Sequence, residues 1–151
     1  MVDNDLKVIR DIFIPSSIDR VWNFLMSEEK MKNWLKADKF IIDMADGGEI
    51  EFPLSFGDED VLILGEFSIL LFEERYTFIW RERDFFGEEW FNCTIVNFDL
   101  EKKESGTLLK LLHDGFKNLP SHQQEQIHQR YTDFWVKSGV LENLSSLILT
   151  D

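Results

Sequence analysis

The sequence predicts an α+β fold in which an antiparallel sheet wraps around one long C-terminal helix. Between Ser121 and Thr150, apolar residues recur at three- and four-residue steps, the spacing that lines one face of a helix. From Lys39 to His113 the pattern changes to a period of two, and short turn-forming segments interrupt it. Strands joined by such short links must be antiparallel, because parallel neighbours need a crossover of roughly a dozen residues.

The chain has 151 residues and a formal net charge of −13. This length predicts a single domain over residues 1–151, and the 14 Phe and 5 Trp indicate a packed interior. The acidic excess argues against binding to nucleic acid or anionic membranes, because both are bound through Lys and Arg. No segment is long and apolar enough to span a bilayer. A single cysteine, Cys93, fits a reducing compartment, so we expect a soluble cytoplasmic protein.

The N-terminal part of the chain predicts one strand and two short helices. Residues Leu6–Ile14 alternate loosely, and Pro15 ends this strand. Ser16 or Ser17 is expected to cap a first helix and Ser27 a second, because a serine hydroxyl can accept a backbone hydrogen bond there. The apolar faces of the two helices consist of Ile18, Val21, Trp22 and Leu25, and of Met31 and Trp34. We expect these helices to close one end of the sheet.

The middle of the chain predicts a series of antiparallel strands. Segments Phe40–Met44 and Glu49–Pro53 are predicted as a hairpin, because Asp46 and two glycines lie between them. The longer strands are predicted at Val61–Leu71, Arg75–Arg83, Glu89–Leu100 and Thr107–His113. With the first strand, this makes a sheet of about six to seven strands.

Alternation within these strands assigns their faces. The side predicted to face the helix carries Tyr76, Trp80, Trp90, Asn92, Leu109 and His113. The outer side carries Ile79, Phe91, Ile95, Leu108 and Leu112. An exposed apolar patch of this kind can mark a partner surface, so a homodimer through the outer sheet face is one interpretation. Scattered surface hydrophobes are the other, and the sequence leaves both open.

The closing helix is predicted to begin after Pro120. Ser121 and Gln124 have the spacing of a capping box, in which the two side chains satisfy backbone donors of the first turn. Its broad stripe comprises Ile127, Tyr131, Phe134, Trp135, Leu141, Leu144 and Ile148. The stripe drifts around the helix near Ser138 and Gly139, and glycine costs about 1 kcal/mol in a helix interior, so we expect a bend there.

Several short motifs, in their order along the chain, resemble homologues of the activator of heat-shock protein 90 ATPase. They are Ile9–Ile12, Pro15–Trp22, Trp34, Gly47–Gly48, Gly65–Phe67, Tyr76–Trp80, Gly106–Thr107 and His113–Phe116. The resemblance spans Val8–Leu149. One departure is that Phe134 and Trp135 lie six residues before Leu141, whereas the family usually has Gly-Trp about four residues before a Leu-x-x-Leu pair.

These homologues belong to the START-like superfamily, also called SRPBCC, of polyketide cyclases and lipid-transport proteins. The resemblance therefore implies a helix-grip fold, a curved antiparallel sheet around a long C-terminal helix. It also implies a link to heat-shock 90 type chaperones and the stress response. The full activators resemble this chain only in their C-terminal part, and we expect no separate N-terminal chaperone-binding domain here.

A hydrophobic cavity is expected between the sheet and the helix, because concave apolar pockets with a few polar groups are the usual ligand sites. The predicted lining is Trp34, Phe52, Phe67, Trp80, Trp90, Asn92, His113, Tyr131 and Trp135. Plain core packing is the competing interpretation of the aromatic members. Asn92 and Thr94 favour a wet cavity, since a buried polar group without a hydrogen bond costs about 1–3 kcal/mol.

His113 is the best single candidate for chemistry, because burial would keep its ring neutral and able to donate and accept. A structural histidine bonded to a backbone carbonyl is the alternative that we favour. No residue stands at a spacing that completes a nucleophile and base pair, so catalysis is not expected. His122 and His128 are six residues apart and lie on different helical faces, so neither a metal nor another cofactor is expected.

Two functions follow as hypotheses. The first is a non-catalytic protein that binds a small apolar or aromatic ligand in the cavity. The second is a chaperone-associated interaction module, which the resemblance implies. A cyclase or hydrolase of the same fold remains open, because function depends on sites and not on folds.

Overall fold

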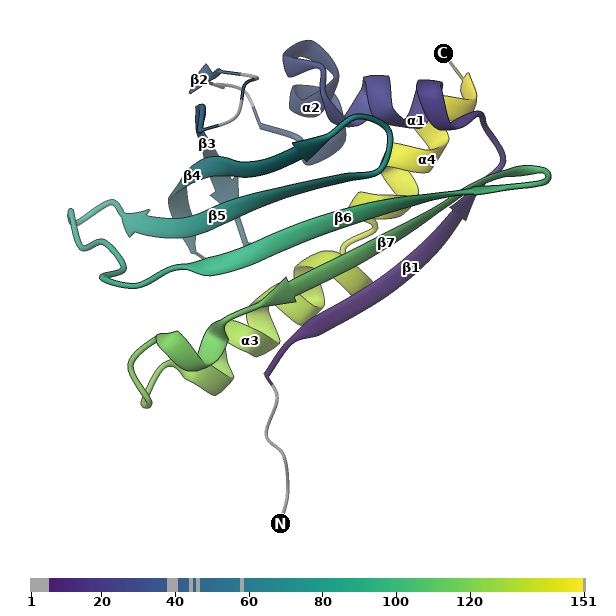
Figure 1. The fold of residues 1–151 in the computed structure, drawn as a ribbon. Helices are drawn as coiled ribbons and strands as arrows, with labels where there is room; N and C mark the ends of the chain where they lie inside the picture. Colours follow the sequence, from purple (N-terminus) through teal and green to yellow (C-terminus); the bar gives the residue numbers. More distant parts are fainter. Residues whose placement is uncertain (1–5, 38–40, 44, 46, 58, 151) are drawn as a thin grey trace.

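The computed structural model describes residues 6–37, 41–43, 45, 47–57 and 59–150. Helices and strands follow one another in the order that Figure 1 labels. They are β1 (Val8–Ile14), α1 (Ile18–Leu25), α2 (Glu28–Leu35), β2 (Ile41–Ile42), β3 (Glu49–Ser55), β4 (Asp60–Leu71), β5 (Arg75–Asp84), β6 (Thr94–Lys103), β7 (Gly106–Asp114), η1 (Phe116–Asn118), α3 (Gln124–Thr132), η2 (Asp133–Lys137) and α4 (Val140–Thr150).

The strands form one seven-stranded antiparallel sheet in the order β1-β7-β6-β5-β4-β3-β2. Figure 1 shows α3 and α4 along one face of this curved sheet, with α1 and α2 beside α4. The predicted α+β architecture, with two short helices after the first strand, is confirmed. The hairpin is confirmed on the described residues, where Ile42 pairs with Ile50, and its predicted members Phe40, Met44 and Asp46 lie outside them.

The C-terminal helix is interrupted at the predicted bend. After α3, residues 133–137 form one π-helical turn, in which the N–H of Ser138 donates to the carbonyl of Asp133 at 2.9 Å. Gly139 then takes a φ of +84°, a left-handed conformation that glycine adopts without a steric penalty. The break lets α3 lie against β1 while α4 contacts α1 and α2.

The predicted cap of the closing helix is wrong, because α3 begins at Gln124 and the side chain of its N-cap residue, Gln123, makes no capping hydrogen bond. The amide of Gln124 instead donates to the carbonyls of Lys117 at 3.1 Å and Leu119 at 2.8 Å. These bonds tie the start of α3 to η1. The cap of α2 is confirmed, since the hydroxyl of Ser27 accepts the N–H of Lys30 at 3.3 Å.

The predicted start of the sixth strand is also wrong, because β6 begins at Thr94 and not at Glu89. The Asp84 side chain accepts the backbone N–H groups of Phe86 and Glu88, both at 2.9 Å, which turns the chain away from the sheet. Asn92 therefore lies in the loop and not on a strand. Its side chain is exposed and donates to the carbonyl of Asn118 at 2.8 Å, so its predicted inward orientation is incorrect.

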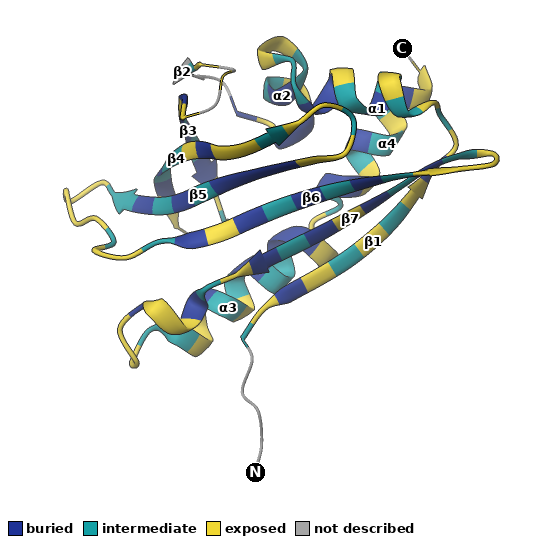
Figure 2. Ribbon diagram, viewed as in Figure 1, coloured by how far each residue is buried: buried dark blue, intermediate teal, exposed yellow. Residues whose placement is uncertain are grey.

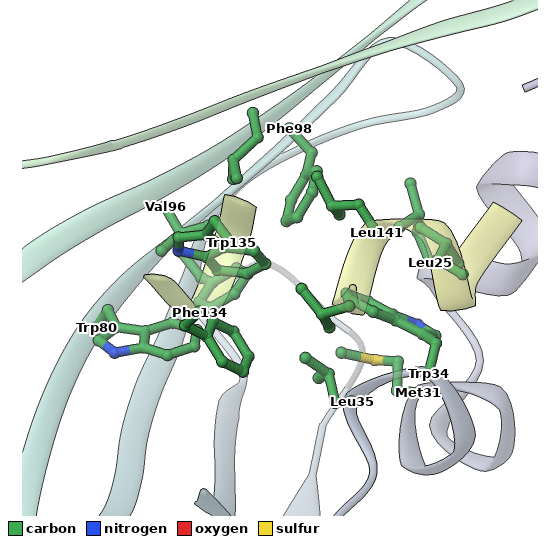
Figure 3. Close-up of a cluster of buried hydrophobic side chains, with 14 of the residues drawn as sticks. Leu25, Met31, Trp34, Leu35, Trp80, Val96, Phe98, Phe134, Trp135 and Leu141 are labelled. Atoms are coloured by element: carbon green, nitrogen blue, oxygen red, sulfur yellow. The ribbon is translucent and has the colours of Figure 1, made fainter. Parts of the chain in front are cut away.

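The predicted faces of β5 and β7 agree with the pattern of burial along those strands (Figure 2), whereas Trp90, like Asn92, lies before the start of β6. On the outer face Ile79, Leu108 and Leu112 are half-buried and Ile95 is exposed, whereas Phe91 lies in the loop, off the sheet. The core fills the space between the sheet and the helices (Figure 3). Its largest fully buried side chains are Trp34, Trp80, Trp135, Tyr76, Tyr131, Phe52, Phe67, Phe98 and Phe116.

Candidate functional site

A buried carboxylate interrupts the apolar inner face of β5. Glu82 follows Tyr76, Phe78 and Trp80 at two-residue steps, and its residue surface is only 5% exposed. A buried charge needs partners, because an isolated ionised carboxylate is strongly disfavoured away from water. The sequence analysis missed Glu82, although its position two residues after Trp80 was sufficient to place it on the inner face.

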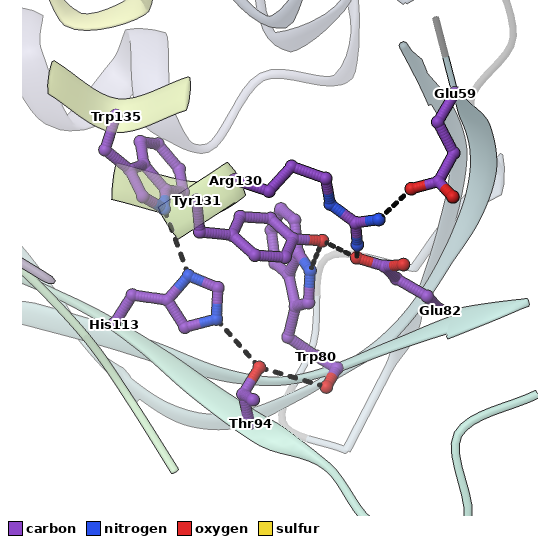
Figure 4. Close-up of polar contacts among 8 residues, drawn as sticks. All are labelled: Glu59, Trp80, Glu82, Thr94, His113, Arg130, Tyr131 and Trp135. Carbon is purple, nitrogen blue, oxygen red and sulfur yellow. Dashed lines mark hydrogen bonds and ion pairs between the residues drawn. The ribbon is translucent and has the colours of Figure 1, made fainter. Parts of the chain in front are cut away.

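The partners of Glu82 come from α3 (Figure 4). The hydroxyl of Tyr131 donates to its Oε2 atom, and the same oxygen forms an ion pair with Nη2 of Arg130. Tyr131 in turn accepts the indole N–H of Trp80 at 2.7 Å. The other guanidinium nitrogen of Arg130 pairs with Glu59, just before β4. The carboxylate thus joins β5 to successive residues of α3.

Burial sets the protonation of this network. It raises the pKa of Glu82 above the usual 4.5, while the charge of Arg130 and the Tyr131 hydrogen bond oppose that rise. Burial and the nearby Glu82 carboxylate also raise the pKa of Tyr131 well above 10.0, so the phenol remains a donor. Arg130 is therefore the group that makes a charged Glu82 tolerable inside the protein.

A pocket of about 370 Å³ lies beside this network, between α3 and the ends of β4 and β5. Its volume is within the roughly 300–1,000 Å³ range of small-molecule sites. Val61, Trp90 and Ile127 provide apolar wall, and Glu82 and Arg130 belong to the polar wall. The remaining lining residues are Glu59, Asp84, Glu88, Glu89, Phe91, Pro120, Gln123 and Gln126. The site can receive an apolar body and offer it one buried polar contact.

His113 belongs to a separate hydrogen-bond chain. The indole N–H of Trp135 donates to its Nδ1 at 3.0 Å, so the ring proton must be on Nε2. Nε2 lies 2.7 Å from the hydroxyl of Thr94, which lies 3.3 Å from the carbonyl of Trp80. Burial lowers the pKa of His113 to about 3, so the ring is neutral. Both nitrogens have partners, and they are side chains rather than the backbone carbonyl we expected.

Among the predicted site residues, Trp90 lines the pocket. Trp80, His113, Tyr131 and Trp135 come together behind it, and the rings of Tyr131 and Phe116 lie 4.7 Å from that of His113. These aromatic groups occupy the space beside His113. Trp34, Phe52 and Phe67 are buried in the core. Asn92, as noted, points to solvent.

Within the described ranges, no group of three or more His, Cys, Asp or Glu side chains is arranged to hold a metal ion. The helices in those ranges are all too short or too polar to cross a membrane.

Known structures share this fold. Protein NE0264 from Nitrosomonas europaea superposes with a TM-score of 0.75 at 17% identity, over 99% of this chain and 97% of that one. Ms6760 from Mycobacterium smegmatis gives 0.77 at 10% identity, over 97% and 93%. DynU16, from the dynemicin biosynthetic locus, gives 0.71 at 18% identity, over 97% of this chain and 48% of that one. At these identities the matches show the fold alone.

Comparison with curated proteins finds no match. The profile of one family, described as Activator of Hsp90 ATPase homolog 1-like protein, matches residues 15–144. This match covers most of the chain and agrees with the resemblance seen in its motifs. The chain therefore belongs to the Activator of Hsp90 ATPase homolog 1-like protein family.

Proposed function

We propose that this protein binds a small molecule with an apolar or aromatic body in the pocket between α3 and the sheet, without transforming it. The pocket itself is the observation that carries the proposal. It combines apolar wall from Val61, Trp90 and Ile127 with a buried carboxylate, Glu82, in a volume of about 370 Å³. Apolar walls supply affinity, and one fixed polar group orients the ligand.

The residues of the site have different roles in this proposal. Trp90 contacts the ligand directly and is half-buried, so ligand binding removes further aromatic surface from water. Tyr131 and Trp80 hold Glu82 in place through their hydrogen bonds. The other predicted residues behind the pocket, His113 and Trp135, fix the position of β7 relative to η2.

A binding role is favoured over catalysis by the state of the two titratable groups. Both ring nitrogens of His113 are engaged, and its low pKa of about 3 makes it a weak base. The Oε2 atom of Glu82 is shared by Arg130 and Tyr131. His113 therefore offers no free nitrogen for proton transfer to a ligand without rearrangement.

Thermal unfolding in the presence of lipophilic and aromatic compounds tests the proposal. A ligand at about 100 times its Kd stabilises the native state by about 2.7 kcal/mol, which raises Tm by several degrees. Trp90→Leu should abolish this rise. Trp22→Leu is the matched control, because Trp22 is also half-buried but packs against Phe72 and Tyr76 instead of lining this pocket. Absence of any stabilising compound, or equal loss in both variants, contradicts the proposal.

Association with a heat-shock 90 type chaperone is the second candidate, and the family match over residues 15–144 favours it. The cytoplasm is the compartment we propose, since Cys93 is a free thiol. Mixing the protein with a purified heat-shock 90 homologue should give a complex and a change in ATP turnover. If neither a complex nor a change in ATP turnover is detected, this second candidate function is contradicted.

A homodimer through the outer sheet face remains a further proposal. The exposed Ile95 and the half-buried Ile79, Leu108 and Leu112 support it. Analytical ultracentrifugation should show a dimer that Ile95→Lys dissociates, and a monomer at high protein concentration contradicts it.

A further inference from the structure

Two adjacent phenylalanines on the loop between β5 and β6 are exposed to solvent. Phe85 is 69% exposed and Phe86 is 95% exposed, and Figure 2 shows that this loop is largely exposed. Beside them runs an open groove of about 820 Å³, whose other wall is α3. Phe56 also lines the groove, so its surface presents three aromatic rings. Such exposed aromatic surface beside a hollow marks an interaction site.

The backbone holds these two aromatic residues in position. The N–H of Asp84 donates to the carbonyl of Glu88 at 2.8 Å, and the N–H of Gly87 donates to the carbonyl of Asp84 at 3.1 Å. The Asp84 side chain accepts two further backbone N–H groups. Gly87 adopts a φ of +90°, which closes the turn without a steric penalty. A surface fixed before binding loses less conformational entropy when a partner docks.

The charge of the groove selects the chemistry of that partner. Its lining carries four carboxylates: Glu59, Asp60, Asp84 and Asp133. Arg130 is the cation among the lining residues, and it is already paired with Glu59 and Glu82. The groove therefore offers negative charge around an apolar strip. A complementary partner carries Lys or Arg on either side of apolar side chains.

Charge also distinguishes among the possible binding partners of the groove. A second copy of this chain would bring its own charge of −13 to the acidic groove, and like charges brought together at an interface oppose association. An anionic lipid surface is repelled in the same way. We propose that this groove docks a basic amphipathic segment of another polypeptide, which inserts apolar side chains between Phe85, Phe86 and α3. This inference goes beyond the small-molecule pocket and does not depend on it, because neither Phe85 nor Phe86 lines that pocket.

Fluorescence anisotropy with three labelled synthetic peptides tests the inference. The first peptide is an amphipathic helix of Leu and Lys, the second replaces every Lys with Glu, and the third replaces every Leu with Ser. The Leu/Lys peptide should bind, and added salt should weaken its binding. The Leu/Glu and Ser/Lys peptides should bind at least about tenfold more weakly, a loss of about 1.4 kcal/mol.

Two double variants locate the binding surface. Phe85→Ser with Phe86→Ser should weaken binding of the Leu/Lys peptide about tenfold or more, because hot-spot aromatic side chains carry most of the affinity. Leu71→Ser with Phe72→Ser is the matched control, since these adjacent residues are 47% and 73% exposed at the turn between β4 and β5. This control should leave binding within about twofold. Unfolding curves check that both variants are folded, and their surface positions predict only small losses of stability.

Several outcomes would overturn the inference. They are no binding of the Leu/Lys peptide, equal binding of the Ser/Lys peptide, and equal weakening by the two double variants. Flotation with vesicles of neutral lipid, and of neutral lipid mixed with phosphatidylserine, measures whether the protein binds a membrane instead. Binding to either vesicle that depends on Phe85 and Phe86 assigns the surface to a membrane and overturns the proposal.

Discussion

The two ends of the space between the sheet and the helices are built differently. At the end covered by α1, α2 and α4, the interior is apolar: Trp34 is 1% exposed, and its ring lies 6.3 Å from that of Phe98 (Figure 3). At the α3 end, the interior contains the charged pair of Glu82 and Arg130 (Figure 4). A pocket lies beside this pair. One end is optimised for packing, and the other retains a buried charge.

This difference indicates where stability and function reside. A buried ion pair adds little net stability compared with well-packed apolar residues, because both charges lose their hydration. A buried charged pair next to a pocket is a departure from apolar packing, and such departures are expected at functional sites. This contrast supports the proposal that a ligand binds at the α3 end, while the α4 end contributes stability.

The largest effect expected from a single substitution is at the packed end. Trp34→Ala should reduce the free energy of unfolding by about 3–5 kcal/mol, because it leaves a cavity that the surrounding core cannot fill. Trp90→Ala, at the other end, should cost less than about 1.5 kcal/mol, since that side chain is only half-buried. Urea unfolding of both variants measures the contrast, and equal losses would contradict the distinction between the two ends.

The next effect is the removal of the cation at the α3 end. Arg130→Met leaves the Glu82 carboxylate buried without a counter-ion, and breaking a buried pair in this way costs about 3–5 kcal/mol. We expect about 3 kcal/mol, the lower limit, because the Arg130 side chain is 18% exposed. Glu82→Gln should cost only about 1 kcal/mol, because it removes the buried carboxylate itself and leaves Arg130 paired with Glu59. Urea unfolding that gave the opposite order would contradict a charged Glu82.

His113 is expected to make the protein sensitive to acid. Its pKa is lowered from 6.5 to about 3 in the folded state, so below pH 6.5 the unfolded chain binds a proton that the folded protein does not. Stability from this residue is present above pH 6.5 and is lost by at most about 1.4 kcal/mol per pH unit as the pH falls toward 3. His113→Gln should lose about 2 kcal/mol at neutral pH and flatten this slope. An unchanged slope would contradict the burial of a neutral ring.

Glu82 should give the smallest effect, and it has the opposite sign. Its folded pKa is raised above 4.5, so around that pH the folded protein binds more protons than the unfolded chain. The contribution of Glu82 is therefore greatest below pH 4.5 and declines as the pH rises through its folded pKa. Subtracting the stability profile of Glu82→Gln from that of the unmodified protein should reveal this decline. A difference that rises with pH would contradict the upward shift.

The sequence was sufficient to predict the architecture, because the change from period two to helical spacing occurs where the sheet ends. It failed where side chains redirect the backbone. The bonds from Asp84 to Phe86 and Glu88 convert part of a predicted strand into a loop, and alternation alone cannot reveal them. Glu82 was missed, although it continues the alternation of Tyr76, Phe78 and Trp80. Its partners Arg130 and Tyr131 lie about fifty residues away, and only the fold brings them together.

The most direct test of the proposed site is an NMR titration of the tryptophan indole N–H signals with the compounds that raise Tm. Trp90 lines the pocket, whereas Trp34 is buried at the packed end and its indole nitrogen has no hydrogen-bond partner among the residues that the structure describes. Binding at the α3 end predicts a saturable shift of the Trp90 signal while the Trp34 signal stays in place. A shift of Trp34 with Trp90 unchanged would place the ligand inside the packed core and contradict the account.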